Sequence, residues 1–372
     1  MIKDMRWKKY KLGDFIERST ANNHSMKYKE DLIVGVTSDG VFSLPKGNVQ
    51  GVDLKPYKIV NNGDFVYNPS RFDLGSIAYR TEGLCIVSHL YQIFHLNEKG
   101  KEKIDPIWLF IYLRRKEFRR EVTFRNFGSQ RPEFNFNDLS EIVLPLPSIE
   151  QQRKYVDVYL ALQNNLVVYQ SKAEELKMVC DGYIEELRRR ASKSIPMVRI
   201  GDYISKRVEK NSDGAITLEQ GINIQKQFIT PQRSNSDLYG RRIVRKGDFA
   251  YCTQLNNENV AIAYREEKDC VVSSVYDIFY IKDESVLFPL YLMLWFRRSE
   301  FGRYVYRLST GTSYEFLSYE DLSDYKIPLP DITIQKEIAN IYKCYIERQR
   351  IAEALKEQIK NICPVLIRGS LT

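Results

Sequence analysis

The chain has 372 residues, of which 43% are apolar and 28% are charged. This composition is typical of a folded protein of two or three domains and excludes a disordered or collagen-like chain. Lysine and arginine number 56 against 48 acidic residues, a net charge of +8, which favours polyanionic partners without requiring them. No run approaches the roughly 18 apolar residues of a membrane span, and the first residues lack the apolar core of a signal peptide. We expect a cytoplasmic protein with no membrane contact.

The first part of the chain alternates short strand-like runs with turns. It opens with the motif LGDFI at residues 12–16, and Gly63-Asp64 is typical of a turn that enters a strand. Cys85-Ile86-Val87 is a β-branched run bounded by turns, as a strand should be. Residues 105–121 then carry aromatic and aliphatic side chains at helical spacing, with arginines outside. These elements predict an α+β domain over residues 1–147.

After the Pro-Leu-Pro punctuation at 145–147, the apolar period changes to a heptad. The a/d seam of a coiled coil is predicted at Tyr155, Tyr159, Leu162, Leu166, Tyr169, Ala173, Leu176, Cys180, Tyr183 and Leu187. Ser148 and Gln151 make a plausible capping box for the helix start. The pattern predicts a helix over residues 148–194, roughly 60 Å long at ~1.5 Å per residue.

The second half of the chain repeats this order, so the sequence is a tandem duplication. The echoes lie 183 to 188 residues further on, near half the chain length, at 200–204, 247–251, 262–265 and 327–330. The repeat predicts a second α+β domain over 195–330, with residues 288–305 helical, and a second long helix over 331–372. Its seam is predicted at Ile334, Ile338, Ile341, Tyr345, Arg348, Ala352, Leu355, Ile359, Ile362 and Leu366, where only Arg348 is polar.

Each long helix alone would expose its seam, and the nearest matching seam belongs to its own repeat. Because the second domain must bring the chain back, we expect the helices to pair antiparallel. An alternative stays open: each helix packs only on its own domain or dimerises with another molecule. Two similar domains held apart by a stiff rod suit the reading of two separated half-sites on one duplex.

The ordered set of motifs resembles the specificity subunit of type I restriction-modification systems. The motifs are the LGD opening, the Gly-Asp-Phe strand entry and PLPSIEQQ at 145–152, with its echo PLPDITIQ at 328–335. The resemblance covers essentially the whole chain. It implies two pseudo-two-fold related target recognition domains joined by two long helices that form an antiparallel coiled coil. Each domain would read one half of a bipartite DNA site, and the helices would set the spacer.

The resemblance also implies partners. They are double-stranded DNA, two modification subunits that use S-adenosylmethionine to methylate adenine, and restriction subunits that act as an ATP-dependent translocase and nuclease. The second helix start departs from the first, because Thr333-Ile334-Gln335 stands where the first copy has Glu150-Gln151-Gln152. Together with Arg348, this departure weakens the expectation that both helix ends dock partners identically.

The sequence carries none of the catalytic motifs that the alternatives would require. Asn68-Pro69-Ser70-Arg71-Phe72 lacks the second proline of an adenine methyltransferase motif, and no GxxxxGK[ST] phosphate loop occurs. His24 and His95 have no visible partner acid or nucleophile, and His89 falls where the repeat has Ser274. The six cysteines form no CxxC pair. We expect no catalytic residue, metal site or cofactor. A stand-alone methyltransferase and a purely structural coiled-coil tether remain the alternatives.

Polar loops that differ between the two halves on a shared framework are the candidate DNA contacts, because Asn and Gln pair with adenine and Arg with guanine. In the first half the candidates are Lys46, Asn48 and Gln50 in a first loop (38–50), Asn68, Ser70 and Arg71 in a second loop (68–72), and Arg125, Asn126, Ser129, Gln130 and Arg131 in a third loop (125–131). In the second half they are Gln225, Lys226 and Gln227 in the first loop (220–227), Gln254, Asn256 and Asn257 in the second loop (254–257), and Thr310, Thr312, Ser313 and Tyr314 in the third loop (308–314). Arginines 114, 115, 119, 120, 297, 298 and 303 could neutralise phosphates, and a solvated helix face is an equal alternative.

Overall fold

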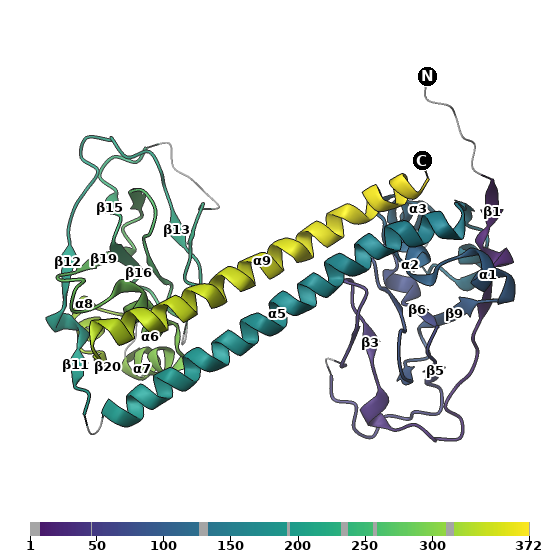
Figure 1. Cartoon of the computed structure of the whole chain (residues 1–372), viewed down its shortest axis with the longest axis horizontal. Coiled ribbons are helices and arrows are strands. Elements are labelled where there is room, and N and C mark those ends of the chain that lie inside the picture. Colours follow the sequence, from purple (N-terminus) through teal and green to yellow (C-terminus); the bar gives the residue numbers. More distant parts are fainter. Residues whose placement is uncertain are drawn as a thin grey trace. The chain divides into compact units, whose positions relative to one another are not determined.

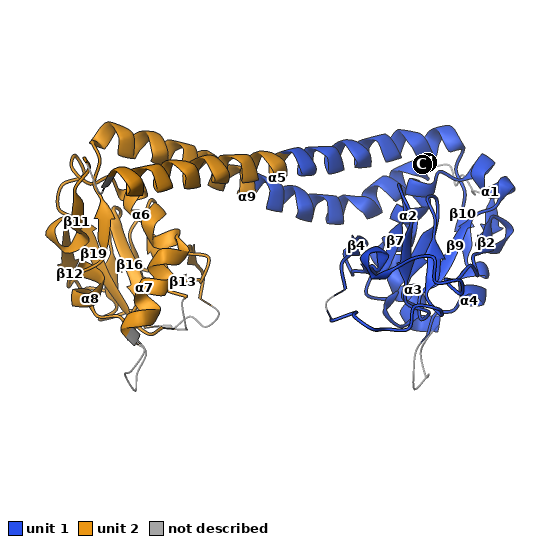
Figure 2. Cartoon of the chain, turned by 90° about the horizontal axis from the view of Figure 1, so that it is seen from below, with its two compact units in different colours: residues 1–168, 351–372 blue, residues 169–350 orange. Residues whose placement is uncertain are grey.

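A computed structural model describes residues 8–45, 47–125, 133–191, 194–231, 237–255, 259–309 and 316–371. The chain divides into two units, shown in different colours in Figure 2. Unit 1 comprises residues 1–168 and 351–372, and unit 2 comprises residues 169–350. The boundary between the units falls inside each long helix, so each unit contains part of both.

The centre of unit 1 is a four-stranded antiparallel sheet in the order β2-β9-β6-β7. These strands are β2 (Ile16–Arg18), β6 (Phe65–Tyr67), β7 (Ile77–Tyr79) and β9 (Gln92–Leu96). Three further antiparallel pairs are β1 (Lys9–Lys11) with β10 (Val143–Pro145), β3 (Gly35–Val36) with β4 (Phe42–Ser43), and β5 (Lys58–Val60) with β8 (Cys85–Val87). The helices are α1 (Glu98–Lys103), α2 (Pro106–Arg114), α3 (Lys116–Arg125) and α4 (Phe136–Ser140).

Unit 2 repeats this topology with the sheet order β12-β19-β16-β17. Its central strands are β12 (Ile204–Arg207), β16 (Asp248–Cys252), β17 (Ile262–Tyr264) and β19 (Tyr276–Ile281). The further pairs are β11 (Met197–Arg199) with β20 (Lys326–Pro328), β13 (Gly221–Ile222) with β14 (Phe228–Ile229), and β15 (Arg242–Val244) with β18 (Cys270–Val272). Its helices are α6 (Pro289–Arg297), α7 (Ser299–Ser309) and α8 (Tyr319–Ser323).

The two cores are built alike, which confirms the tandem duplication. Phe65 and Phe94 stack on neighbouring strands of unit 1 with ring centroids 4.8 Å apart, and Phe249 and Phe279 do so in unit 2 at 5.0 Å. Gly63 and Gly247 enter the equivalent strands with φ of 91° and 94°. This left-handed conformation is one that glycine adopts without steric cost, so the predicted turns are confirmed.

Each predicted domain helix is in fact two helices. Residues 105–121 divide into α2 and α3 at Arg115, and residues 288–305 divide into α6 and α7 at Arg298. Both arginines are extended, with ψ of 149°. The first helix of each pair is buried nearly all round, including every residue from Trp108 to Leu113. The prediction of one helix over each of these ranges was therefore wrong, because each range contains a buried helix followed by a more exposed one.

The long helices are α5 (Ile149–Ala191) and α9 (Ile332–Ser370), and they lie side by side within each unit (Figure 1). In unit 1 the ring of Tyr155 lies against Gly369, and Tyr159 lies near Cys363. As the residue number increases along α5, the number of the facing residue on α9 decreases, so these two helix segments run antiparallel. Within the part of the chain that the structure describes, no helix is long and apolar enough to cross a membrane.

The predicted seam faces inward, with one exception. Tyr183 is 50% exposed, and its neighbour Ile184 is 1% exposed and packs in the unit 2 core. A straight helix drifts against a 3.5-residue repeat, which accounts for the one-residue shift. Arg348 stays partly buried, close to the carboxylate of Glu175.

Two equivalent glutamines attach the long helices to the domains. Gln152 is fully buried; its Oε1 accepts the Asp105 N–H at 2.8 Å, and its Nε2 donates to the carbonyls of Lys103 and Pro147 at 2.8 and 2.9 Å. Gln335 does the same with the Phe288 N–H and the carbonyls of Val286 and Pro330, each at 2.9 Å. The two helix starts are therefore held alike, although the residues preceding the glutamines differ.

Candidate nucleic-acid interface

The first candidate loop in each unit contains the tip of a two-stranded hairpin. In unit 1, Thr37 N–H donates to Val41 O at 3.0 Å and Gly40 N–H to Thr37 O at 3.1 Å. In unit 2, Asn223 and Lys226 make the equivalent bonds within residues 223–227 at 3.1 and 3.0 Å. Residues 38–40 therefore correspond to 224–226.

The third residue of each tip is left-handed, with φ of +75° at Gly40 and +63° at Lys226. Such a φ is uncommon for a residue other than glycine. The Lys226 ammonium donates to the carbonyl of Val260 at 2.9 Å, and burial, together with the charge of Arg297, lowers its pKa to about 8. Gln225 and Gln227 are exposed on either side. The proposed contact of Lys226 with DNA stays a prediction, and it requires the ammonium to leave Val260.

The second candidate loop packs against the first in unit 1. Asn68 caps a short 3₁₀ helix, η3 (Pro69–Arg71), by accepting the Ser70 N–H at 3.0 Å, which leaves Ser70 and Arg71 exposed. Ser76 Oγ donates to Val36 O at 3.0 Å. A cleft of about 450 Å³ is lined by residues of the hairpin and by Arg71. Asn48 and Gln50 are exposed in the segment after the hairpin.

The second loop also meets the chain that follows the third loop, in both units. In unit 1 the Phe134 N–H donates to Pro69 O at 3.0 Å, and in unit 2 the Leu317 N–H donates to Thr253 O at 2.8 Å. Gln254 forms a β-bridge with Phe316 and is exposed. The fold thus gathers segments far apart in the sequence that flank the candidate loops.

Much of the third loop and some other candidates lie outside the described residues. These are Lys46, Asn126, Ser129, Gln130, Arg131, Asn256, Asn257, Thr310, Thr312, Ser313 and Tyr314. Arg125 is described at the end of α3, where it is exposed and pairs with Glu121 at 3.0 Å. All of these remain predicted DNA contacts.

Most of the domain-helix arginines are engaged inside the protein. Arg114 and Arg119 donate to the carbonyls of Ser38 and Asp73 at 3.3 and 2.6 Å. Arg115 lies 3.7 Å from the ring centroid of Tyr112. In unit 2, Arg298 pairs with Glu300 at 2.8 Å. These four are therefore structural side chains in this fold, while Arg120 and Arg303 are exposed and fit the phosphate role better.

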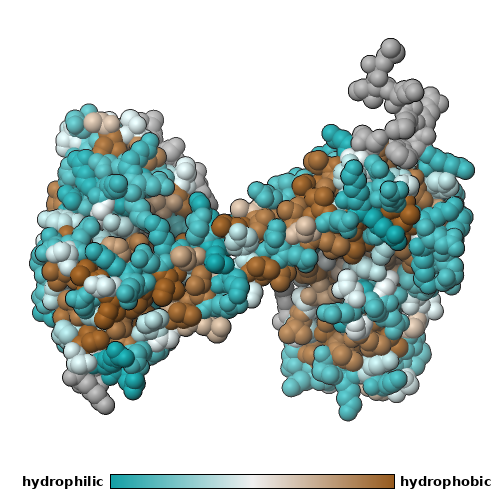
Figure 3. All heavy atoms as spheres, in the orientation of Figure 1, coloured by the Kyte–Doolittle hydropathy of each residue, from teal (hydrophilic) through white to brown (hydrophobic). Residues whose placement is uncertain are grey.

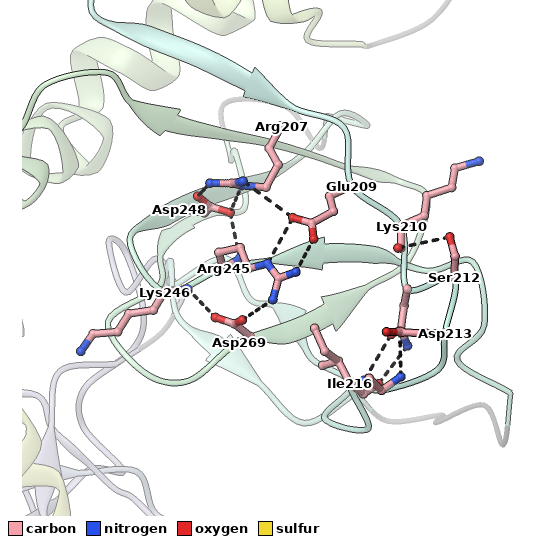
Figure 4. Close-up of polar contacts among 12 residues, drawn as sticks. Arg207, Glu209, Lys210, Ser212, Asp213, Ile216, Arg245, Lys246, Asp248 and Asp269 are labelled. Carbon is pink, nitrogen blue, oxygen red and sulfur yellow. Dashed lines mark hydrogen bonds and ion pairs between the residues drawn. The ribbon is translucent and has the colours of Figure 1, made fainter.

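Unit 2 carries a network of ion pairs around Asp248 (Figure 4). Arg207 holds Asp248 with two bonds of 2.6 and 2.9 Å, and Arg245 links Glu209 to Asp269. At the position equivalent to Asp248, Asp64 instead lies 3.5 Å from His95 Nδ1. The expectation that His95 has no partner acid was therefore wrong. No cluster of His, Cys, Asp and Glu fit to hold a metal ion occurs among the described residues.

The comparison with known families decides what these repeated units are. The family model of the type I restriction modification DNA specificity domain matches the chain twice, at residues 5–178 and 182–361. The chain belongs to this family. Each match covers one α+β domain and the greater part of the helix that follows it, as the repeat requires.

Relatives of the specificity family match over nearly the whole chain. A protein of Methanocaldococcus jannaschii, named as the MjaX type I restriction enzyme specificity subunit, is 21% identical over 416 residues, covering 98% of this chain and 93% of the relative. The crystal structure of a type I restriction-modification S subunit from M. genitalium matches with a TM-score of 0.66 and 13% identity, covering 99% of this chain and 96% of that one. At this identity the structural match establishes the fold of a specificity-family protein.

Proposed function

We propose that the chain is the DNA-reading subunit of a type I restriction-modification complex, in which each unit reads one half of a bipartite site. The observation that carries the proposal is a matching fold with different loops. The hairpin tips and the segments after β6 and β16 occupy equivalent places in the two units. Their side chains differ, with Ser70 and Arg71 in one unit and Gln254 in the other. A shared framework with unlike polar loops is what two unlike half-sites require.

The long helices are proposed to set the spacer between the half-sites. α5 is one uninterrupted helix of 43 residues that contributes to the cores of both units. At ~1.5 Å per residue it is roughly 60 Å long, which corresponds to about eighteen base pairs of duplex at most. We propose that the antiparallel pairing found within each unit continues as a coiled coil.

The outer faces of the helices are proposed to dock two modification subunits. Exposed apolar side chains lie on α5 in both units, and Figure 3 shows apolar atoms along the long helices on the face in view. They are Val158, Leu160, Val167 and Val168 in unit 1, and Met178, Val179 and Tyr183 in unit 2. Exposed apolar patches mark interaction sites. Methyl transfer from S-adenosylmethionine, and ATP-driven translocation and cleavage by restriction subunits, are assigned to these partners and not to this cytoplasmic chain.

A genome-wide map of adenine methylation with and without the chain tests the proposal. We expect a split motif of two short half-sites that vanishes on deletion and returns on complementation. Unchanged methylation after deletion would overturn the proposal and leave a structural tether. Methylation by the purified chain with S-adenosylmethionine alone would instead establish a stand-alone methyltransferase.

Substitution in the third loop should act on one half-site alone. We expect Gln130→Ala or Arg131→Ala to relax discrimination in the half-site read by unit 1 by about 1–3 kcal/mol, because each removes one base contact. Binding to duplexes altered in either half, measured at several salt concentrations, gives the readout. Ser313→Ala is the matched control and should act only on the other half. Equal losses in both halves for all three variants would contradict the assignment of units to half-sites.

A further inference from the structure

An arginine at an equivalent place in each unit donates hydrogen bonds to the backbone of the hairpin tip. Arg114 is the last residue of α2, and its Nη2 donates to Ser38 O at 3.3 Å. Arg297 is the last residue of α6, 183 positions later, and its Nη1 and Nη2 donate to the carbonyls of Gln225 and Lys226 at 3.2 Å each. The acceptors lie on the backbone of the tip, so this contact does not depend on the divergent loop side chains.

The same guanidinium groups also lie against the long helices. Arg114 and Tyr159 of α5 line one pocket of about 500 Å³ together with Ser38 and Cys363 of α9. The guanidinium of Arg297 lies 5.8 Å from the ring centroid of Tyr342 on α9. Tyr342 follows Tyr159 by 183 residues, so the two arrangements are equivalent. Each arginine therefore joins a candidate recognition loop, a core helix and a spacer helix.

The hairpins need such a contact because they are small. Each has two paired residues per strand, Gly35–Val36 with Phe42–Ser43 and Gly221–Ile222 with Phe228–Ile229. A hairpin of this size is not stable alone in water. Tyr91 and Tyr276 fix the strands, their hydroxyl oxygens accepting the Val36 and Ile222 N–H at 3.2 and 3.1 Å. Arg114 and Arg297 hold the tips, and in unit 2 the bond of the Lys226 ammonium to Val260 O adds to the contact.

We propose that Arg114 and Arg297 are positioning residues for DNA recognition: each holds the hairpin tip of its unit at a fixed place against the spacer helix. The inference rests on the proposed function and deepens it. An arginine is suited to this role because its planar group offers five donors and packs on aromatic faces. Burial lowers the pKa of Arg114, and the charge remains because arginine does not deprotonate in proteins.

The loss of an arginine that positions a loop has a different effect on DNA binding from the loss of an arginine that contacts a phosphate. An arginine on a phosphate adds affinity for every sequence, and its loss weakens binding evenly and reduces the salt slope by about one. An arginine that fixes a loop adds discrimination at the half-site which that loop reads. Arg297→Gln should therefore lower discrimination about tenfold in one half-site, leave the other half-site unchanged and keep the salt slope.

The test uses the full chain assembled with its modification subunits and a library of random duplexes. Discrimination at each half-site is measured for the wild type, Arg297→Gln, Arg297→Lys and Arg114→Gln, with the exposed Arg303→Gln and Arg120→Gln as controls in the matching units. We expect Arg297→Gln and Arg114→Gln to relax opposite half-sites and Arg297→Lys to restore less than full discrimination. The controls should keep discrimination at both half-sites.

A second variant tests the contact from the other side. A Cβ added at Gly40 would lie 2.5 Å from Arg114 Nη1 at a φ of +75°. Gly40→Ala should therefore displace the guanidinium from the tip and relax the same half-site as Arg114→Gln. If a glutamine variant fails to fold, Gly40→Ala and Arg297→Lys still test whether the arginine positions the tip. Even loss of affinity across all sequences, or unchanged discrimination in the folded variants, overturns the inference. If the wild type itself selects no split motif, the proposed function has failed first.

Discussion

Replacing Arg207 with alanine should lower the free energy of unfolding of unit 2 by about 3 kcal/mol. The carboxylate of Asp248 is 1% exposed and accepts two bonds from this guanidinium, beside one from the Arg245 N–H at 2.8 Å. Removing one partner of a buried ion pair leaves an uncompensated charge, at a cost of about 3–5 kcal/mol. The low end applies because the Arg207 side chain is 27% exposed. Urea denaturation, monitored by hydrogen exchange of the backbone amides in each unit, measures the free energy of unfolding of that unit.

Unit 1 provides the matched control for this prediction. Asp64 stands at the equivalent position, 6% exposed, where it accepts the Asn61 N–H at 2.7 Å and, among the residues that the structure describes, meets no bidentate arginine. Asp64→Asn keeps an acceptor for that bond, so it should change the unfolding free energy by less than about 1 kcal/mol. Asp248→Asn should cost about as much as Arg207→Ala. Similar losses for the two aspartate variants would refute the difference between the units.

The stability of unit 1 should depend on pH through Asp64. Burial raises the pKa of Asp64 above its ordinary value of 3.8. The folded unit therefore prefers the protonated carboxyl, and its contribution to stability is present below pH 3.8 and is lost as the pH rises through the raised pKa. Asp64→Asn should remove this decline.

Replacing Gln335 with alanine should lower the unfolding free energy of unit 2 by about 3 kcal/mol. The change leaves one N–H and two carbonyls, those of Phe288, Val286 and Pro330, without their bonds to the glutamine side chain. A buried polar group left unsatisfied costs about 1–3 kcal/mol. Thermal unfolding measures the loss, and hydrogen exchange should rise first at the start of α9.

The neighbouring Glu337 is exposed on the same helix turn, so Glu337→Ala is the control and should change stability by less than about 0.5 kcal/mol. Gln152→Ala should reproduce the loss in unit 1. A full effect of Glu337→Ala, or none of Gln335→Ala, would show that the bonds of the glutamine do not hold the helix start.

The repeat and the long helices could be predicted because periodicity reports which face of a helix is buried. Heptads placed α5 and α9 within a few residues of their observed bounds, and the seam failed only where Ile184 replaces Tyr183 in the core. The break at Arg115 could not be read in the same way. Neither glycine nor proline marks it, and the extended conformation depends on tertiary packing of the fully buried α2.

The side chains that organise the candidate interface were harder to predict. The sequence favoured neither a phosphate contact nor a solvated helix face for Arg114 and Arg297, because it does not reveal that a guanidinium turns inward to backbone carbonyls. Gln152 and Gln335 were overlooked beside the mismatch in the preceding residues. The sequence did contain a signal for them. A glutamine stands near the start of both long helices, and the two glutamines are separated by the repeat distance of 183 residues. The tip residue Lys226 gave no sign of its left-handed conformation.

The division of the chain inside its long helices has a consequence for exchange of specificity. Unit 2 is one continuous stretch, 169–350, whereas unit 1 combines the beginning and the end of the polypeptide. A single gene cassette with junctions at Val168/Tyr169 and Arg350/Ile351 would therefore transplant a whole unit, with its own helix segments and core contacts. Junctions placed at the ends of the α+β domain would instead separate Ile184 and Ile338 from the core in which they pack.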